Sequence, residues 1–190
     1  MYTVQRCHLK IGAYIMIQFV NTFIYNFAVG FVMGIIGLII GRIVPRDRID
    51  ASKFPYKTYK WERGGKTYNK LGINHWKDKL PDVSIYLKSV FPKRVETSQD
   101  KKDAEFFMLF AKETCVSEFV HTVLMFASPI FYVVNKSVYW GVWTTIIYFL
   151  GNIPFIMVQR YNRPRLLSIA KRAEDTQKEH ISYTDIASYR

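Results

Sequence analysis

The sequence predicts an all-α integral membrane protein with about three transmembrane helices, or four if its first apolar segment crosses twice. Three observations support this fold class. The apolar residues of the 190-residue chain are gathered in three blocks, whereas a soluble core distributes them periodically. With their flanking residues, the blocks are long enough to cross a hydrocarbon layer of roughly 30 Å as helices. The charged residues lie between and after the blocks, where water and headgroups solvate them.

Length and composition indicate one membrane domain over residues 1–190. We divide it into a first hydrophobic block (11–44), a basic interfacial loop (45–112), a transmembrane hairpin (113–158) and a basic tail (159–190). The net charge of +12 suits the anionic headgroups of a membrane leaflet. No aromatic-and-basic motif for nucleic acid accompanies this charge. We therefore expect membrane lipids, and no nucleic acid, among its partners.

The first hydrophobic block carries no charge until Arg42. It exceeds the length of one crossing, so it predicts either one tilted helix or an interfacial helix followed by a span from about Asn21. Four glycines recur at spacings of four, three and four residues, which places them on one helical face. They are Gly30, Gly34, Gly37 and Gly41. This face predicts close helix packing, either within the chain or between copies in a homo-oligomer.

The interfacial loop mixes bulky aromatic residues with cations, a composition typical of the headgroup layer. Gly64 and Gly65 predict a turn that lacks the framework of a phosphate-binding loop. The later segment around Trp76, Lys77 and Asp82 suits either headgroup binding or substrate binding. We take these three residues as candidates for contacting substrate.

The second and third blocks, 119–134 and 138–158, predict an antiparallel hairpin around Lys136. The second helix can begin near Lys112, and the third is expected to end over residues 159–165. Of the 27 Lys and Arg residues, all but three lie between Arg42 and Lys112 or in the tail. The exceptions are Arg6, Lys10 and Lys136. The positive-inside rule therefore places the loop, the tail and the functional site on the cytoplasmic side of the cell membrane.

The hairpin brings the start of its first helix to the same interface as the end of its second. Glu118 and His121 are three residues apart and share a helical face, which Glu113 also approaches. Ionisable groups near a bilayer are costly, so these three are candidate catalytic residues. Glu118 can orient His121 as a general base. The same groups can share a divalent metal, or merely pair at the membrane rim.

The end of the third block offers a candidate substrate site. Three arginines within six residues suit a phosphate or carboxylate, because guanidinium forks bind these anions with two hydrogen bonds. The alternative is a stop signal obeying the positive-inside rule, but such a signal would accept lysine, and three arginines favour a shaped anion site. Asn152 can bridge the carbonyl that Pro154 leaves without a donor, or point into the site. The candidate substrate-binding residues here are Asn152, Arg160, Asn162, Arg163 and Arg165.

Together these segments resemble the glycosyl-4,4'-diaponeurosporenoate acyltransferase family of staphyloxanthin-type carotenoid biosynthesis. The resemblance covers roughly residues 61–171 and is closest over 152–154 and 158–166. It also includes Gly65-Lys66, Asn69-Lys70, the segment 76–82, Glu113-Thr114, Glu118 and His121. It implies a membrane-embedded acyltransferase that moves a fatty acyl chain to a hydroxyl of a glycosylated lipid or carotenoid.

The resemblance implies no bound cofactor, with an acyl donor such as acyl-CoA as co-substrate. In the expected scheme the arginine cluster holds the donor phosphate and His121 deprotonates the acceptor hydroxyl. Asn152 or an arginine then stabilises the oxyanion.

Two other functions fit the same residues. One is a metal-dependent membrane hydrolase or transferase acting on a lipid phosphate, with Glu113, Glu118, His121 and Asp82 as ligands to a divalent metal. The other is a non-enzymatic membrane subunit, whose glycine face binds a partner and whose basic loop binds anionic lipid.

Overall fold

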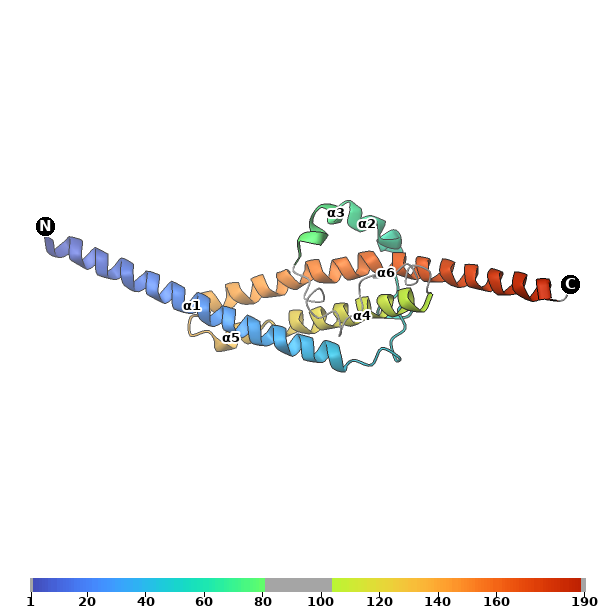
Figure 1. Cartoon of the computed structure of the whole chain (residues 1–190). Helices are drawn as coiled ribbons and strands as arrows, with labels where there is room; N and C mark the ends of the chain where they lie inside the picture. Colours follow the sequence, from blue (N-terminus) through green and yellow to red (C-terminus); the bar gives the residue numbers. More distant parts are fainter. Residues whose placement is uncertain (1, 81–103, 189–190) are drawn as a thin grey trace.

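The computed structural model describes residues 2–80 and 104–188, with side chains described for 16–80 and 104–178. These residues form helices and no strands. Three segments are long and apolar enough to cross a membrane, Met16–Ile43, Ala104–Val134 and Val138–Lys178. The prediction of an all-α membrane protein with about three transmembrane helices is therefore confirmed. Figure 1 shows the three long helices side by side, with the two termini pointing away from each other.

The first hydrophobic block forms a single helix, α1 (Tyr2–Ile43), without interruption. At 1.5 Å per residue its 42 residues exceed the thickness of a bilayer core. The chain does not break near Asn21, so the alternative of a separate interfacial helix is not observed. Asn26 is accommodated because its side chain and that of Asn135 exchange hydrogen bonds of 2.8 and 3.3 Å across the helices.

The second block differs from the prediction at both ends. Its helix, α4 (Ala104–Ala127), begins eight residues before Lys112, so the last part of the expected interfacial loop is helical. The helix stops before Pro129, and a short helix, α5 (Ile130–Val134), resumes after it. Proline has no N–H for the helical ladder, and its ring clashes with the preceding turn, which explains the interruption.

The third block continues much further than predicted. Helix α6 (Val138–Ser188) runs for 51 residues and passes through both Pro154 and Pro164. We expected it to end over residues 159–165. A proline inside a helix costs about 3 kcal/mol. Burial of the neighbouring Tyr161, Arg163 and Leu166 offsets this cost because packed side chains hold the turn in place.

The described part of the interfacial loop folds onto α6 as a series of short helices. They are η1 (Lys60–Gly65), α2 (Lys66–Asn69), α3 (Ile73–Trp76) and η2 (Lys77–Lys79). Figure 1 shows them beside the middle of α6, and buried Tyr68, Ile73 and Tyr161 form the contact. Gly65 makes the predicted turn with φ of 90°, and a Cβ there would lie 3.1 Å from the Tyr161 carbonyl oxygen. Only glycine fits this turn against α6.

Candidate functional site

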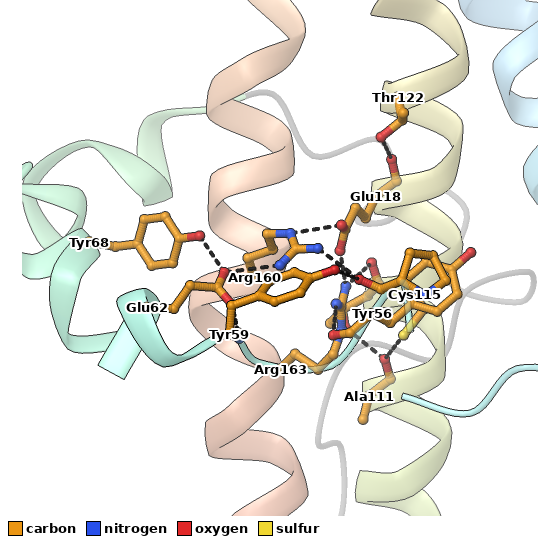
Figure 2. Close-up of polar contacts among 12 residues, drawn as sticks. Tyr56, Tyr59, Glu62, Tyr68, Ala111, Cys115, Glu118, Thr122, Arg160 and Arg163 are labelled. Carbon is orange, nitrogen blue, oxygen red and sulfur yellow. Dashed lines mark hydrogen bonds and ion pairs between the residues drawn. The ribbon is translucent and has the colours of Figure 1, made fainter. Parts of the chain in front are cut away.

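The centre of the site is the carboxylate of Glu118 on α4, which lies between two arginines of α6 (Figure 2). Arg160 Nε donates to Glu118 Oε1 at 2.8 Å, and Arg163 Nη2 donates to Oε2 at 2.5 Å. The expected convergence of Glu118 with the arginine cluster is therefore present in the structure. Both carboxylate oxygens are neutralised by guanidinium groups, so a buried negative charge is tolerated here.

Arg163 is buried, with 1% of its surface exposed, and connects several segments through hydrogen bonds. Besides Glu118, its guanidinium donates to the Thr114 hydroxyl at 2.9 Å, the Thr114 carbonyl at 3.1 Å and the Tyr56 carbonyl at 2.7 Å. These four acceptors come from α4 and the interfacial loop. An added phosphate would have to displace them, so the geometry favours a positioning role for Arg163 over the anion-binding role that we expected.

Glu62 completes the network and was not among the residues selected from the sequence. Its Oε1 accepts hydrogen bonds from the Tyr68 hydroxyl at 2.6 Å and from Arg160 Nη1 at 3.1 Å. Its Oε2 accepts one from the Tyr59 backbone N–H at 2.6 Å. Burial, followed by the hydrogen bond to the Glu62 carboxylate, raises the pKa of Tyr68. The only sequence signal was a single acidic residue in a run of aromatics and cations, ahead of the Gly64-Gly65 turn.

Glu113 lies apart from this network. Its two carboxylate oxygens accept hydrogen bonds from Arg46 Nε at 2.8 Å and Nη2 at 3.2 Å. This paired contact ties the chain just after α1 to α4. The sequence placed Glu113 near His121 but did not identify Arg46 as its partner.

A cavity of about 700 Å³ lies between α1, α4 and α6. Its volume is within the range of about 300–1,000 Å³ that is usual for small-molecule sites. Most of the lining is aliphatic or aromatic. The polar groups that line it include Lys77, Glu113, Ser117, His121 and Gln159.

His121 lines this cavity, and its position is fixed by two residues of α6. Its Nδ1 lies 3.0 Å from Asn152 Oδ1, and its ring stacks on Phe155 with a centroid distance of 4.5 Å. Asn152 Nδ2 donates to the Tyr148 carbonyl at 2.8 Å. Since a carbonyl only accepts, the Asn152 amide oxygen must face His121 and accept a hydrogen bond from Nδ1–H. In the neutral imidazole, Nε2 then carries the lone pair.

Asn152 therefore points into the site, which is one of the two positions we predicted for it. It does not bridge the carbonyl freed by Pro154, because its amide nitrogen bonds the Tyr148 carbonyl four residues earlier in the helix. The expectation that Glu118 orients His121 also needs correction. Both Glu118 oxygens receive arginine donors, and the amide of Asn152 holds Nδ1 instead. A guanidinium fork offers a carboxylate stronger charge-assisted hydrogen bonds than a neutral imidazole does.

The remaining predicted contact residues are spread around the site. Lys77 lines the cavity and its Nζ pairs with Asp78 at 2.9 Å. Trp76 is partly buried against the Tyr68 cluster and donates to the Leu71 carbonyl. Arg165 is exposed and its guanidinium lies 3.8 Å from the centre of the Tyr161 ring. Asn162 is partly buried on α6, and Asp82 lies outside the described residues.

The glycine face of α1 packs within the chain. A Cβ at Gly37 would lie 3.0 Å from Leu124 Cδ1, and one at Gly41 would lie 3.4 Å from Val120 Cγ2, both on α4. All four glycines also line the cavity. Close helix packing is thus observed inside one copy, and a homo-oligomer through this face stays a prediction.

A metal site is not apparent in the parts of the chain that the structure describes. No group of three or more His, Cys, Asp or Glu side chains converges among them. Glu113 and Glu118, two of the ligands considered, are each paired with arginine. The arrangement instead offers a histidine with a fixed tautomer on the wall of an apolar cavity, supported by a buried charge network.

The chain is similar to proteins of one known family. Residues 52–172 match the family model described as glycosyl-4,4'-diaponeurosporenoate acyltransferase. A protein of that name from Staphylococcus haemolyticus (strain JCSC1435) is 32% identical over 113 residues, covering 58% of this chain and 63% of that protein. Relatives with the same name from Staphylococcus aureus are 27% identical over 130 residues in strain bovine RF122 / ET3-1 and 29% identical over 118 residues in strain USA300.

The match to the RF122 / ET3-1 protein covers 67% of this chain and 75% of that protein. The match to the USA300 protein covers 61% of this chain and 68% of that protein. The chain thus spans less than two thirds of the length of the S. haemolyticus relative. No solved structure matches this chain.

Proposed function

The chain belongs to the glycosyl-4,4'-diaponeurosporenoate acyltransferase family, and from this membership we propose that it transfers a fatty acyl chain inside the membrane. The acceptor is a hydroxyl of a glycosylated lipid or carotenoid. The donor is an activated acyl group such as acyl-CoA. The observation that carries the proposal is His121, whose tautomer is fixed and which lies on the wall of an apolar cavity.

His121 is the general base in this reaction. The acceptor hydroxyl oxygen attacks the acyl carbonyl carbon while its proton passes to Nε2 of His121. The bond between the acyl carbon and the donor sulfur then breaks, and the thiolate leaves and takes up the proton. Asn152 accepts from Nδ1 and stabilises the imidazolium that forms between these steps.

The buried network of Glu62, Glu118, Arg160 and Arg163 positions the site. It joins the interfacial loop, α4 and α6. The proposed reaction requires these three regions to keep fixed positions relative to one another. A small displacement of a catalytic group lowers the rate strongly, so a rigid support is valuable. The roles that the sequence suggested for the cations therefore change. Arg160 and Arg163 support the site, and the exposed Arg165 and the cavity-lining Lys77 are the cations proposed to meet the donor phosphate.

The site opens, in this proposal, towards the cytoplasmic face of the cell membrane. The excess of cations in the interfacial loop and tail favours that orientation. A cytoplasmic opening also gives a water-soluble donor access, while the lipid acceptor reaches the site from the bilayer.

Lipid mass spectrometry tests the function directly. Cells expressing the wild-type chain are compared with cells expressing His121→Ala or His75→Ala at matched protein levels. His75 is exposed and does not line the cavity, so it provides the histidine control. We expect a glycolipid or glycosylated carotenoid heavier by one acyl chain with the wild type and His75→Ala. Its rate of formation should fall about a hundredfold or more with His121→Ala, the usual contribution of a general base. Unchanged product from His121→Ala would refute the scheme.

A further inference from the structure

We infer that the apolar end of the cavity binds the fatty acyl chain that is transferred, and that Gly34 limits the length of chain that fits. The inference rests on the proposed acyl transfer for the identity of the chain. It adds a location for that chain and a residue that selects among chains.

The lining of the cavity is divided along its length. The helices α1 and α4 run antiparallel, since Gly41 faces Val116 and Val120 while Gly37 faces Val120 and Leu124. The polar lining residues Glu113, Lys77 and Gln159 belong to the end near the interfacial loop. The other end is apolar and includes Phe27, Phe31 and Leu124, while Phe155 stacks on His121. His121 lies between the two ends on α4.

This division decides which substrate lies at which end. Both the acceptor hydroxyl and the acyl carbonyl must meet His121. The hydroxyl belongs to a sugar, whose polar surface requires the polar end. An acyl chain is apolar from the first carbon after its carbonyl, so its burial is favourable in the apolar end. The lining helices α1, α4 and α6 are those capable of crossing the membrane, so a lipid chain can enter from the bilayer.

Gly34 borders open space in this apolar end. A Cβ added there would have no neighbour within 4 Å among the described residues beyond its own turn of helix. Gly37 differs, because a Cβ there would lie 3.0 Å from Leu124 and 3.2 Å from Val120. Gly37 therefore packs against α4 at the level of His121. Gly34 lies three residues, or about 4.5 Å, further along α1, where the absence of a side chain leaves room for a chain to continue.

Binding of fatty acids tests this assignment without relying on catalysis. The purified full-length chain in detergent is loaded with the fluorescent fatty acid cis-parinaric acid, which is then displaced by lauric, myristic, palmitic and stearic acids. The variants are Gly34→Leu, Gly34→Ala and Gly151→Leu. Gly151 is the matched control, since a Cβ there also has no described neighbour within 4 Å and the residue does not line the cavity.

Gly34→Leu is expected to weaken stearic acid about tenfold relative to lauric acid, the effect of excluding about two methylene groups from an apolar site. Gly34→Ala should give a smaller shift in the same direction. If the leucine variant does not fold, as judged by size-exclusion chromatography, the affinity ratio of Gly34→Ala is the test. Gly151→Leu should keep the wild-type order of affinities. An unchanged ratio in both Gly34 variants, or an equal shift in Gly151→Leu, overturns the inference.

The same variants separate this inference from the proposed function. Acyl-chain lengths in the cellular product are measured alongside the binding. Shorter chains in the Gly34→Leu product support both ideas. A shifted order of fatty acid affinities, with no acylated product even from the wild type, would support the acyl-chain site and refute acyl transfer. Normal product with unchanged chain lengths would refute the role of Gly34 alone.

Discussion

Arg163 of α6 donates to Glu118 of α4 from a position that is 99% buried, 45 residues away in the sequence. The same guanidinium binds Thr114 and the Tyr56 carbonyl, so one side chain joins both helices of the hairpin to the interfacial loop. Removing either member of a buried ion pair leaves the other charge without compensation, which is far more costly than losing a surface pair.

Arg163→Lys should therefore destabilise the protein strongly. A lysine ammonium cannot reproduce the planar fork that reaches four acceptors at once. We expect a loss of about 1–3 kcal/mol for each buried acceptor left without a donor, measured by thermal unfolding of the purified protein in detergent. Arg165→Lys is the matched control, because Arg165 is exposed and stacks on Tyr161. A loss of similar size in both variants would contradict the connecting role of Arg163.

Tyr68→Phe should cost stability and change its dependence on pH. The lost hydrogen bond to the Glu62 carboxylate is worth about 1.5–3 kcal/mol near neutral pH. In the folded wild type the raised pKa keeps Tyr68 protonated where an unfolded tyrosine, with a pKa of about 10, loses its proton. The wild type therefore has its full stabilisation below about pH 10 and loses it as the pH rises towards the folded pKa.

The two proteins should thus converge in stability at high pH. Thermal unfolding of wild type and Tyr68→Phe from neutral pH to about pH 11 measures this difference. Because all other titrating groups are common to both chains, they cancel in the comparison. A constant gap across the range would show that Tyr68 does not titrate differently on folding.

Asn152→Leu should lower the rate of acyl transfer without a matching loss of substrate affinity. Leucine keeps the volume but cannot accept the hydrogen bond from His121 Nδ1–H, so the catalytic tautomer is no longer favoured. Loss of one such hydrogen bond corresponds to about a tenfold lower kcat, with KM little changed. Asn135→Leu is the control, since Asn135 also bridges two helices but bonds Asn26 instead of His121. Equal losses of kcat in the two variants would reduce Asn152 to a general packing role.

Gly37→Leu should destabilise the protein by about 1–3 kcal/mol, the usual cost of overpacking. Its side chain would collide with Leu124 and Val120 where α1 approaches α4. Gly34→Leu points into the cavity and should leave the unfolding temperature close to that of the wild type. The comparison is made by thermal unfolding in the same detergent. Equal stability of both variants would mean that α1 does not depend on close contact at Gly37.

The sequence by itself determined the membrane class, the three spans, the hairpin and the region where charged residues meet. Hydropathy blocks and cation placement are local properties that the bilayer imposes on any chain. The glycine spacing likewise predicted a packing face, because helical periodicity fixes which residues share a side. The motifs that resemble the family also led to His121 and Asn152, whose direct contact the structure then displayed.

Only the tertiary structure decided which partner each charged group takes. Glu118 was paired with His121 from their spacing on one helix, but the arginines of α6 reach it with stronger, charge-assisted hydrogen bonds. Glu62 and Arg46 were missed because the charged residues they pair with lie 98 and 67 residues away, and spacing carries no information about such distances. The continuation of α6 through Pro164 has the same origin. Local propensity ends a helix at proline, and burial of Tyr161 and Arg163 against other segments outweighs that propensity.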